Sequence, residues 1–241
     1  MKKIFAANWK LFKTPQETRD FFSTFKDLAN KATGEIVFFP SAISLEAASS
    51  SLKGSNIKWG AQNCFAQASG AFTGENSAQV VKDLGGSYIL VGHSERRKIF
   101  GETDALIAEK VAHIQSLGLI PMLCIGETLE EREGKHTFRI LETQLLLGLA
   151  NADKSKPVVI AYEPVWAIGT GKVASPEQVA ETHADVYSIL EKMGFAQSPI
   201  LYGGSVKPDN AKGLAALPHV SGFLVGGASL EPKSFSEIAS V

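Results

Sequence analysis

The chain has 241 residues, with 24 Lys and Arg against 25 Asp and Glu, so its formal net charge at pH 7 is −1. Because it has neither a basic block nor an acidic tail, we do not expect nucleic acid or an anionic membrane as a partner. The first residues lack the apolar run of a signal peptide, and no stretch approaches the roughly 18 uninterrupted apolar residues of a membrane span, so we expect a cytoplasmic protein.

Short apolar runs alternate with longer amphipathic segments along the chain. We expect eight strands, at residues 3–9, 35–39, 57–63, 87–92, 119–125, 158–163, 200–203 and 222–225. Helix starts are indicated by a capping residue followed by proline at Thr14-Pro15 and Ser175-Pro176, and others lie near Thr103 and Lys207. Strands that alternate with helices predict a parallel sheet. Eight units of about 30 residues match the size at which such a sheet closes, so we expect residues 1–241 to form one α/β domain, a (β/α)8 barrel.

Polar residues follow the first and fourth expected strands. Asn8 and Lys10 lie at the end of the first strand, and His93 and Glu95 follow the fourth. In a barrel the carboxyl ends of all strands face one mouth, so these side chains would converge. A lone lysine at such a position is usually solvated, and a lone histidine beside an apolar run is more often a satisfied core residue, so neither identifies a site by itself.

The sixth expected strand ends on a carboxylate and opens into an apolar loop. Glu163 is followed by Pro164, which has no N–H to continue the ladder, so the chain leaves the sheet there. The loop from Pro164 to about Ala174 carries Trp166 and Ile168 and could close over a ligand and exclude water. The alternative is an ordinary loop with a solvated glutamate.

Three glycine-rich turns are candidates for phosphate binding, because glycine lets backbone amides approach an anion closely. They are Gly169-Thr170-Gly171, Gly203-Gly204-Ser205 and Gly226-Gly227-Ala228-Ser229. The second and third follow the last two expected strands, where barrels often bind phosphate. Each alone could be a tight connecting turn.

The sequence indicates neither a cofactor nor a metal. Gly169-Thr170-Gly171-Lys172 lacks the Ser or Thr that a nucleotide-binding loop needs after the lysine. Cys64 and Cys124 form no CxxC pair, and the five histidines lack the i, i+4 spacing of a helical metal site.

Taken together, the motifs resemble the triosephosphate isomerase family from end to end. They are Asn8-Trp9-Lys10, Gly70-Ala71-Phe72-Thr73-Gly74-Glu75, Gly92-His93-Ser94-Glu95-Arg96-Arg97, Cys124-Ile125-Gly126-Glu127, the segment 161–171 that begins Ala161-Tyr162-Glu163-Pro164, and Tyr202-Gly203-Gly204-Ser205-Val206. The resemblance implies an aldose–ketose isomerase of glycolysis and gluconeogenesis. Its substrates would be dihydroxyacetone phosphate and D-glyceraldehyde 3-phosphate.

The same resemblance implies a role for each candidate residue. Glu163 would be the base that moves a proton between adjacent carbons. His93 would polarise the carbonyl as a neutral donor whose pKa is lowered by the helix start, as is known for this family. Lys10 would stabilise the enediolate, and Asn8 would support the polar network. Backbone amides of Gly169, Ser205, Gly226 and Gly227 would bind the phosphate, and Ser94 and Glu95 would support the catalytic side chains.

The family is usually a homodimer in which the loop with Phe72 and Thr73 inserts beside the partner's active site. The resemblance therefore implies that Thr73 braces Asn8 and Lys10 of the partner subunit. The chain departs from the family at Leu11-Phe12-Lys13, where Met-Asn-Gly is commonest. This segment helps to form the docking pocket, so the dimer is less strongly indicated than the activity.

Two other functions stay open on the sequence. A retaining glycosidase barrel also places two carboxylates at strand ends, and Glu95 and Glu163 could take those roles, but the phosphate turns disfavour it. A non-catalytic sugar-phosphate binder would keep the glycine turns but would not need His93 and Glu163 together.

Overall fold

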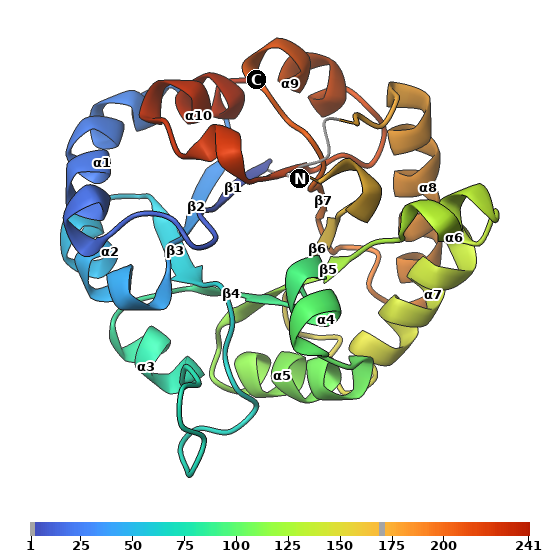
Figure 1. The fold of residues 1–241 in the computed structure, drawn as a ribbon, viewed down its shortest axis with the longest axis horizontal. Helices are drawn as coiled ribbons and strands as arrows, with labels where there is room; N and C mark the ends of the chain where they lie inside the picture. The colour runs from blue at the N-terminus through green and yellow to red at the C-terminus, as the bar shows by residue number, and fades with distance from the viewer. Residues whose placement is uncertain (1–2, 169–171) are drawn as a thin grey trace.

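The computed structural model describes residues 3–168 and 172–241, and its strands form a closed parallel barrel (Figure 1). Each strand pairs with the next in the chain, and β8 pairs with β1. The strands are β1 (Ile4–Asn8), β2 (Glu35–Phe39), β3 (Lys58–Ala61), β4 (Tyr88–Val91), β5 (Ile120–Ile125), β6 (Val159–Tyr162), β7 (Ile200–Tyr202) and β8 (Gly222–Val225). The predicted (β/α)8 fold class is confirmed.

Helices surround the barrel on its outside, as Figure 1 shows. They are α1 (Pro15–Leu28), α2 (Leu45–Leu52), α3 (Ala78–Asp83), α4 (Ser94–Phe100), α5 (Asp104–Ser116), α6 (Leu129–Glu133), α7 (Thr137–Gly148), α8 (Pro176–Met193), α9 (Pro208–Ala215) and α10 (Pro232–Ala239). Short 3-10 helices add η1 (Ala29–Lys31), η2 (Ala42–Ser44), η3 (Val165–Ala167) and η4 (Gly227–Ser229). No helix of the residues described is long and apolar enough to cross a membrane.

Two of the predicted helix starts show the expected local chemistry. The hydroxyls of Thr14 and Ser175 accept the backbone N–H of Glu17 and Gln178, whose side chains accept the cap residues' own N–H groups. Each start therefore satisfies two amides that the helix leaves without a partner. The proline after each cap fits because its position needs no donor.

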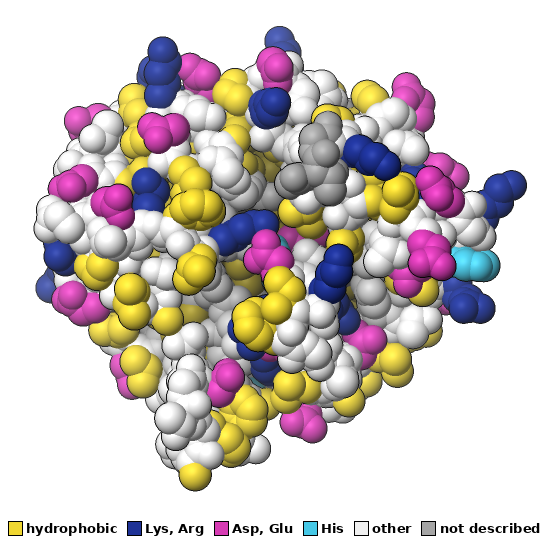
Figure 2. Space-filling model, in the orientation of Figure 1, with side chains coloured by type: hydrophobic (Ala, Val, Ile, Leu, Met, Phe, Trp, Pro, Cys, Tyr) yellow, Lys and Arg dark blue, Asp and Glu magenta, His cyan; other side chains and the backbone are white. Residues whose placement is uncertain are grey.

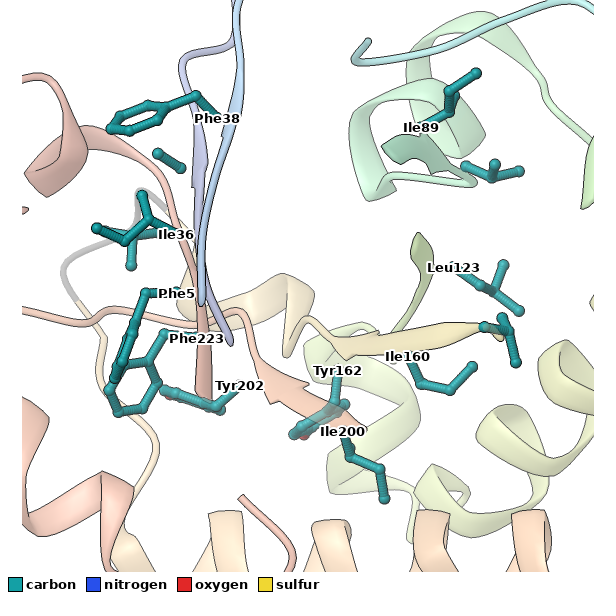
Figure 3. Packing of buried hydrophobic residues seen from close by; sticks show 14 of the residues in the cluster. Phe5, Ile36, Phe38, Ile89, Leu123, Ile160, Tyr162, Ile200, Tyr202 and Phe223 are labelled. Atoms are coloured by element: carbon teal, nitrogen blue, oxygen red, sulfur yellow. The ribbon is translucent and has the colours of Figure 1, made fainter. Parts of the chain in front are cut away.

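Side chains alternate along each strand and so form two cores. In β1, Ile4 and Ala6 point into the barrel, whereas Phe5 and Ala7 point outward to the helices. The interior is filled by Ile4, Ala6, Val37, Phe39, Tyr88, Leu90, Met122, Cys124, Val159, Ala161, Leu201 and Leu224. Figure 3 shows part of the outer cluster, in which Phe5 and Phe223 lie with their ring centroids 6.0 Å apart. A filled interior leaves ligand chemistry to the mouth of the barrel.

An aromatic cluster fixes the end of β1 to its neighbours. The ring of Trp9 lies 4.8 Å from Phe21, 5.3 Å from Phe22 and 5.3 Å from Phe38, measured between centroids. The indole Nε1 of Trp9 donates to the carbonyl of Ser229, 3.2 Å away, beyond β8. The backbone on either side of Trp9, which carries Asn8 and Lys10, is therefore held against the adjoining end of β8.

Six of the observed strands are shorter than the sequence predicted, at one end or both, whereas β2 and β8 have the predicted bounds. The predicted strand at 158–163 is observed as Val159–Tyr162, and that at 57–63 as Lys58–Ala61. Pairing nevertheless continues one residue further, because Glu163 N–H donates to Ile125 O at 2.7 Å. Glu163 thus lies just beyond the end of β6, at the mouth of the barrel.

Candidate active site

Glu163 and His93 form the centre of the site, where the chain leaves β6 and β4, the two strands that flank β5. Glu163 Oε1 lies 3.0 Å from His93 Nε2, and Glu163 Oε2 accepts the N–H of Ser94 at 3.2 Å. The two residues are buried, with 3% of Glu163 and 5% of His93 exposed. His93 is the residue before α4, and its Nδ1 accepts the N–H of Glu95 at 3.3 Å. That bond leaves Nε2 as the nitrogen that carries the proton.

The pKa of His93 is shifted in the direction opposite to the one that the sequence predicted. Burial lowers the pKa of His93, but the charge and hydrogen bond of Glu163 raise it, and the net direction is upward. This direction is opposite to the lowered pKa that the resemblance implied, because in this arrangement the Glu163 carboxylate is in contact with the imidazole of His93. Burial raises the pKa of Glu163, whereas His93, the Ser94 amide and Lys10 lower it, with a net downward shift.

Lys10 and Asn8 lie at the same mouth. Lys10 Nζ donates to Glu95 Oε1 at 2.7 Å, and the Lys10 backbone N–H donates to Asn8 Oδ1 at 3.0 Å. Lys10 has a φ of 49°, in the left-handed region that a non-glycine residue rarely adopts. Gln62 stabilises this backbone, because its Nε2 donates to Lys10 O at 2.8 Å and to Phe39 O at 2.9 Å. The backbone of Lys10 is therefore held in place, and its ammonium is in contact with Glu95.

A cavity of about 360 Å³ connects these side chains to two of the three predicted phosphate turns. Its lining comprises Asn8, Lys10, Phe12, His93, Glu163, Ala167, Ile168, Gly203, Gly204, Ser205, Val206, Lys207, Leu224, Gly226, Gly227 and Ala228. Figure 2, in the orientation of Figure 1, shows basic and acidic side chains next to each other in the hollow at the centre of this face. Gly169, the first residue of the remaining turn, lies outside the described residues.

Both described turns are held by hydrogen bonds to neighbouring elements. Ser205 Oγ donates to Ala167 O at 3.0 Å, which ties the turn after β7 to the loop after β6. Ser229 Oγ donates to Gly226 O at 2.6 Å and fixes the turn after β8. A side chain on Gly204 would collide with the Tyr202 hydroxyl, since a Cβ would lie 2.2 Å from it. The close approach of the Tyr202 side chain therefore requires glycine at this position of the turn.

The loop after Glu163 is attached to a buried carboxylate. Glu127 is fully buried, and its Oε1 accepts the indole N–H of Trp166 at 2.9 Å, the Tyr162 hydroxyl at 3.1 Å and Arg132 NH1 at 2.9 Å. The Arg132 guanidinium also lies 5.4 Å from the centroid of the Trp166 ring. These contacts hold the base of the loop, residues 164–168, at one side of the cavity.

Sequence reasoning missed Gln62, Arg97 and Glu127. Arg97 Nε donates to Gly92 O at 2.7 Å, and its NH2 donates to Cys124 O at 3.2 Å, so it ties the end of β4 to β5. Arg97 and Glu127 belong to motifs that were recognised, but no role was given to them. Gln62 follows β3, so the rule that polar residues at strand ends reach the mouth could have found it.

The site has the parts for moving a proton between buried groups, beside turns that could bind an anion. It has a carboxylate, an imidazole with its proton on Nε2, an ammonium and two backbone turns. In the described part of the chain, no group of three or more His, Cys, Asp or Glu side chains could hold a metal ion. All the candidate residues outside the undescribed segment converge on this cavity or contact a residue that lines it.

Comparison with known proteins gives one consistent result. The sequence model of a family described as triosephosphate isomerase matches residues 3–241. A protein named triosephosphate isomerase from Bdellovibrio bacteriovorus is 79% identical over 241 residues, which cover 100% of both chains. Proteins of the same name from Aquifex aeolicus and Solibacter usitatus are 44% identical over 243 residues and 45% identical over 246 residues. They cover 99% of this chain and 98% and 99% of their own lengths.

Proposed function

This chain belongs to the triosephosphate isomerase family, and we propose that it interconverts dihydroxyacetone phosphate and D-glyceraldehyde 3-phosphate in glycolysis and gluconeogenesis. The observation that carries the proposal is the contact of Glu163 with His93 inside a cavity that also contains Lys10 and two glycine turns. No redox step is needed, because the two triose phosphates are isomers.

The reaction requires one proton to move between carbons and one between oxygens. Glu163 takes a proton from C1 of dihydroxyacetone phosphate, and the electron pair of the broken C–H bond gives an enediolate. His93 Nε2–H donates to the carbonyl oxygen as negative charge develops there and assists the exchange of a proton between O1 and O2. Glu163 then returns its proton to C2, which gives the aldehyde.

Glu163 must leave its resting partners to do this. In the described arrangement its carboxylate is held by His93 and the Ser94 amide, which keep its pKa low. A side-chain rotation would release it toward the substrate, and closure of the loop 164–174 would remove water and raise its basicity. We therefore propose supporting roles for two residues. The Ser94 amide holds Glu163 at rest, and Glu95 positions His93 and Lys10.

Lys10 and Asn8 are proposed to bind and stabilise the reacting end of the substrate. The Lys10 side chain lines the cavity together with His93 and Glu163, and a positive charge there stabilises the enediolate. Asn8 fixes the Lys10 backbone through its Oδ1, which leaves its amide group for the substrate. Backbone amides of Ser205, Gly226 and Gly227 would bind the phosphate, together with Gly169.

A homodimer is also proposed, on the distribution of exposed apolar side chains. Leu11 is 96% exposed and Phe12 55%, and further exposed apolar residues are Ile43, Phe72, Ile99 and Phe100. They lie in or near the connections that follow β1, β2, β3 and β4, which are adjacent at the mouth of the barrel. The loop between β3 and α3 projects from the barrel (Figure 1) and carries Phe72, whose ring is tilted by 36° against that of Phe65 with 4.1 Å between centroids. Such a patch fits a second copy better than water. We also propose that the protein acts in the cytoplasm.

The decisive experiment follows proton exchange at C1 of dihydroxyacetone phosphate in deuterated water by NMR, with purified protein and no added metal. We expect deuterium at C1 together with the appearance of D-glyceraldehyde 3-phosphate. The matched control is Glu163→Gln, which keeps the size of the side chain but removes its basicity, and it should abolish both signals.

Failure would take one of two forms. If neither signal appears while inorganic phosphate still binds, the chain is a sugar-phosphate binder that has the fold of an isomerase. If Glu163→Gln exchanges as fast as the wild type, the isomerase has a different base.

A further inference from the structure

Lys207 lines the same cavity as Lys10 and comes directly after the turn Gly203-Gly204-Ser205 and Val206. Its side chain is exposed, whereas the residues of the two glycine turns that line the cavity are small or apolar and carry no formal charge. The cavity therefore has a second cation at its rim, in addition to the lysine beside Glu163.

The backbone of Lys207 is held in one conformation. Lys207 is extended, with φ −136° and ψ 164°, as expected of a residue that precedes a proline. Its N–H donates to Asn210 Oδ1 at 2.9 Å, and Asn210 Nδ2 donates to Ser205 O at 3.1 Å. Asn210 thus links the backbone of Lys207 to the turn Gly203-Gly204-Ser205. The backbone of Lys207 is therefore fixed relative to the amides of that turn.

The other charged side chains of the site are already in contact with one another, whereas Lys207 could bind an anion. Lys10 already contacts Glu95 at 2.7 Å, and Glu163 contacts His93. Among the residues that the structure describes, Lys207 forms no ion pair. A phosphate bound at the glycine turns would carry up to two negative charges, and backbone amides supply only partial positive charge to meet them.

We propose that Lys207 is a substrate-binding residue that contacts the phosphate dianion from the rim of the cavity and strengthens its binding. The inference rests on the proposed function for the identity of the substrate, but it concerns the phosphate end and not the proton transfer. Because the ammonium is solvated, its attraction is screened by salt, and the contribution to binding is modest. The effect should appear in KM and leave kcat nearly unchanged, because the phosphate does not change during the reaction.

The test compares Lys207→Gln with Lys207→Arg and with Lys212→Gln. Lys212 lies on α9, is also exposed and does not line the cavity, so its variant changes the net charge equally. Isomerase kinetics are measured at low and high ionic strength, and the Kd of inorganic phosphate is measured by calorimetry. For Lys207→Gln we expect KM and the phosphate Kd to rise by about two- to fivefold at low salt, and the difference to shrink at high salt. Lys207→Arg should keep most of the wild-type affinity, and Lys212→Gln should match the wild type.

Each other outcome is informative. Equal KM and phosphate Kd in Lys207→Gln and Lys212→Gln would overturn the inference, as would a fall in kcat without a change in phosphate affinity. If the wild type does not isomerise triose phosphates but Lys207→Gln alone weakens phosphate binding, the proposed function fails while the role of Lys207 in phosphate binding stands.

Discussion

The backbone of Gly203 lies directly against the side chain of Glu163, such that a Cβ on Gly203 would lie 2.9 Å from Glu163 Cγ. The glycine at the end of β7 therefore decides where the carboxylate of β6 can lie. Replacing Gly203 with alanine should displace Glu163 and lower kcat by about tenfold or more, since displacing a reacting group by about 1 Å has large effects. Steady-state kinetics would measure this. Gly213→Ala on α9, where a Cβ meets nothing within 4 Å, is the control; equal kcat in the two variants would contradict the prediction.

Glu163→Asp tests the reach of the base without removing its charge. The shorter side chain withdraws the carboxylate by about 1 Å, so we expect kcat to fall by roughly 10²-fold with little loss of substrate affinity. The measurement is kcat and KM in both directions of the reaction. An unchanged kcat would show that Glu163 is not the base.

Lys110 is a buried cation that connects Asn63, at the start of the β3–α3 loop, to Glu102. Only 1% of it is exposed, and its Nζ donates to Asn63 Oδ1 at 2.9 Å and to Glu102. Lys110→Met would leave Glu102 and Asn63 short of a partner, and we expect a loss of about 3 kcal/mol in the free energy of unfolding. Urea denaturation at one protein concentration would measure it. The control is Lys98→Met at an exposed position, and equal midpoints in the two variants would refute the prediction.

His183 should make the protein less stable in acid. Burial lowers its pKa to about 4, although the nearby His219 carbonyl raises it. In the unfolded chain a histidine has a pKa of about 6.5 and is protonated below that pH. In the folded protein His183 is not protonated until the pH falls to about 4. Stability therefore falls as the pH drops through this window, by about 2 kcal/mol between pH 7 and pH 5. Denaturation at several pH values should give a smaller slope for His183→Gln, and an equal slope would show that His183 is not responsible.

The proposed dimer can be tested with two phenylalanines of similar exposure. Phe72 in the β3–α3 loop is 41% exposed, and Phe138 on α7 is 39% exposed. Phe72→Asp places a charge in the proposed interface and should shift the protein toward monomer, whereas Phe138→Asp should not. Sedimentation velocity at several concentrations distinguishes them. A wild type that is a fully active monomer would remove the dimer from the proposal.

Much of the architecture could be predicted because it depends on local patterns. The alternation that sends Ile4 and Phe5 to opposite faces of β1 is set by the period of a strand, and the caps at Thr14 and Ser175 are formed within four residues. The exact strand ends were predicted less well, since a strand stops where its neighbour's ladder stops. That limit depends on a partner far away in sequence.

The sequence by itself determined the eight-fold succession of strands and helices, the family, and the strand-end positions of Asn8, Lys10, His93 and Glu163, because period and motif are properties of residue order. Only the tertiary structure decided which side chains contact one another. It placed Glu163 against His93 and so reversed the predicted pKa shift, gave Glu127 its three donors, and brought Lys207 to the rim of the cavity. The physical reason is that hydrogen bonds and charge interactions depend on distance in space, and closure of the barrel sets those distances.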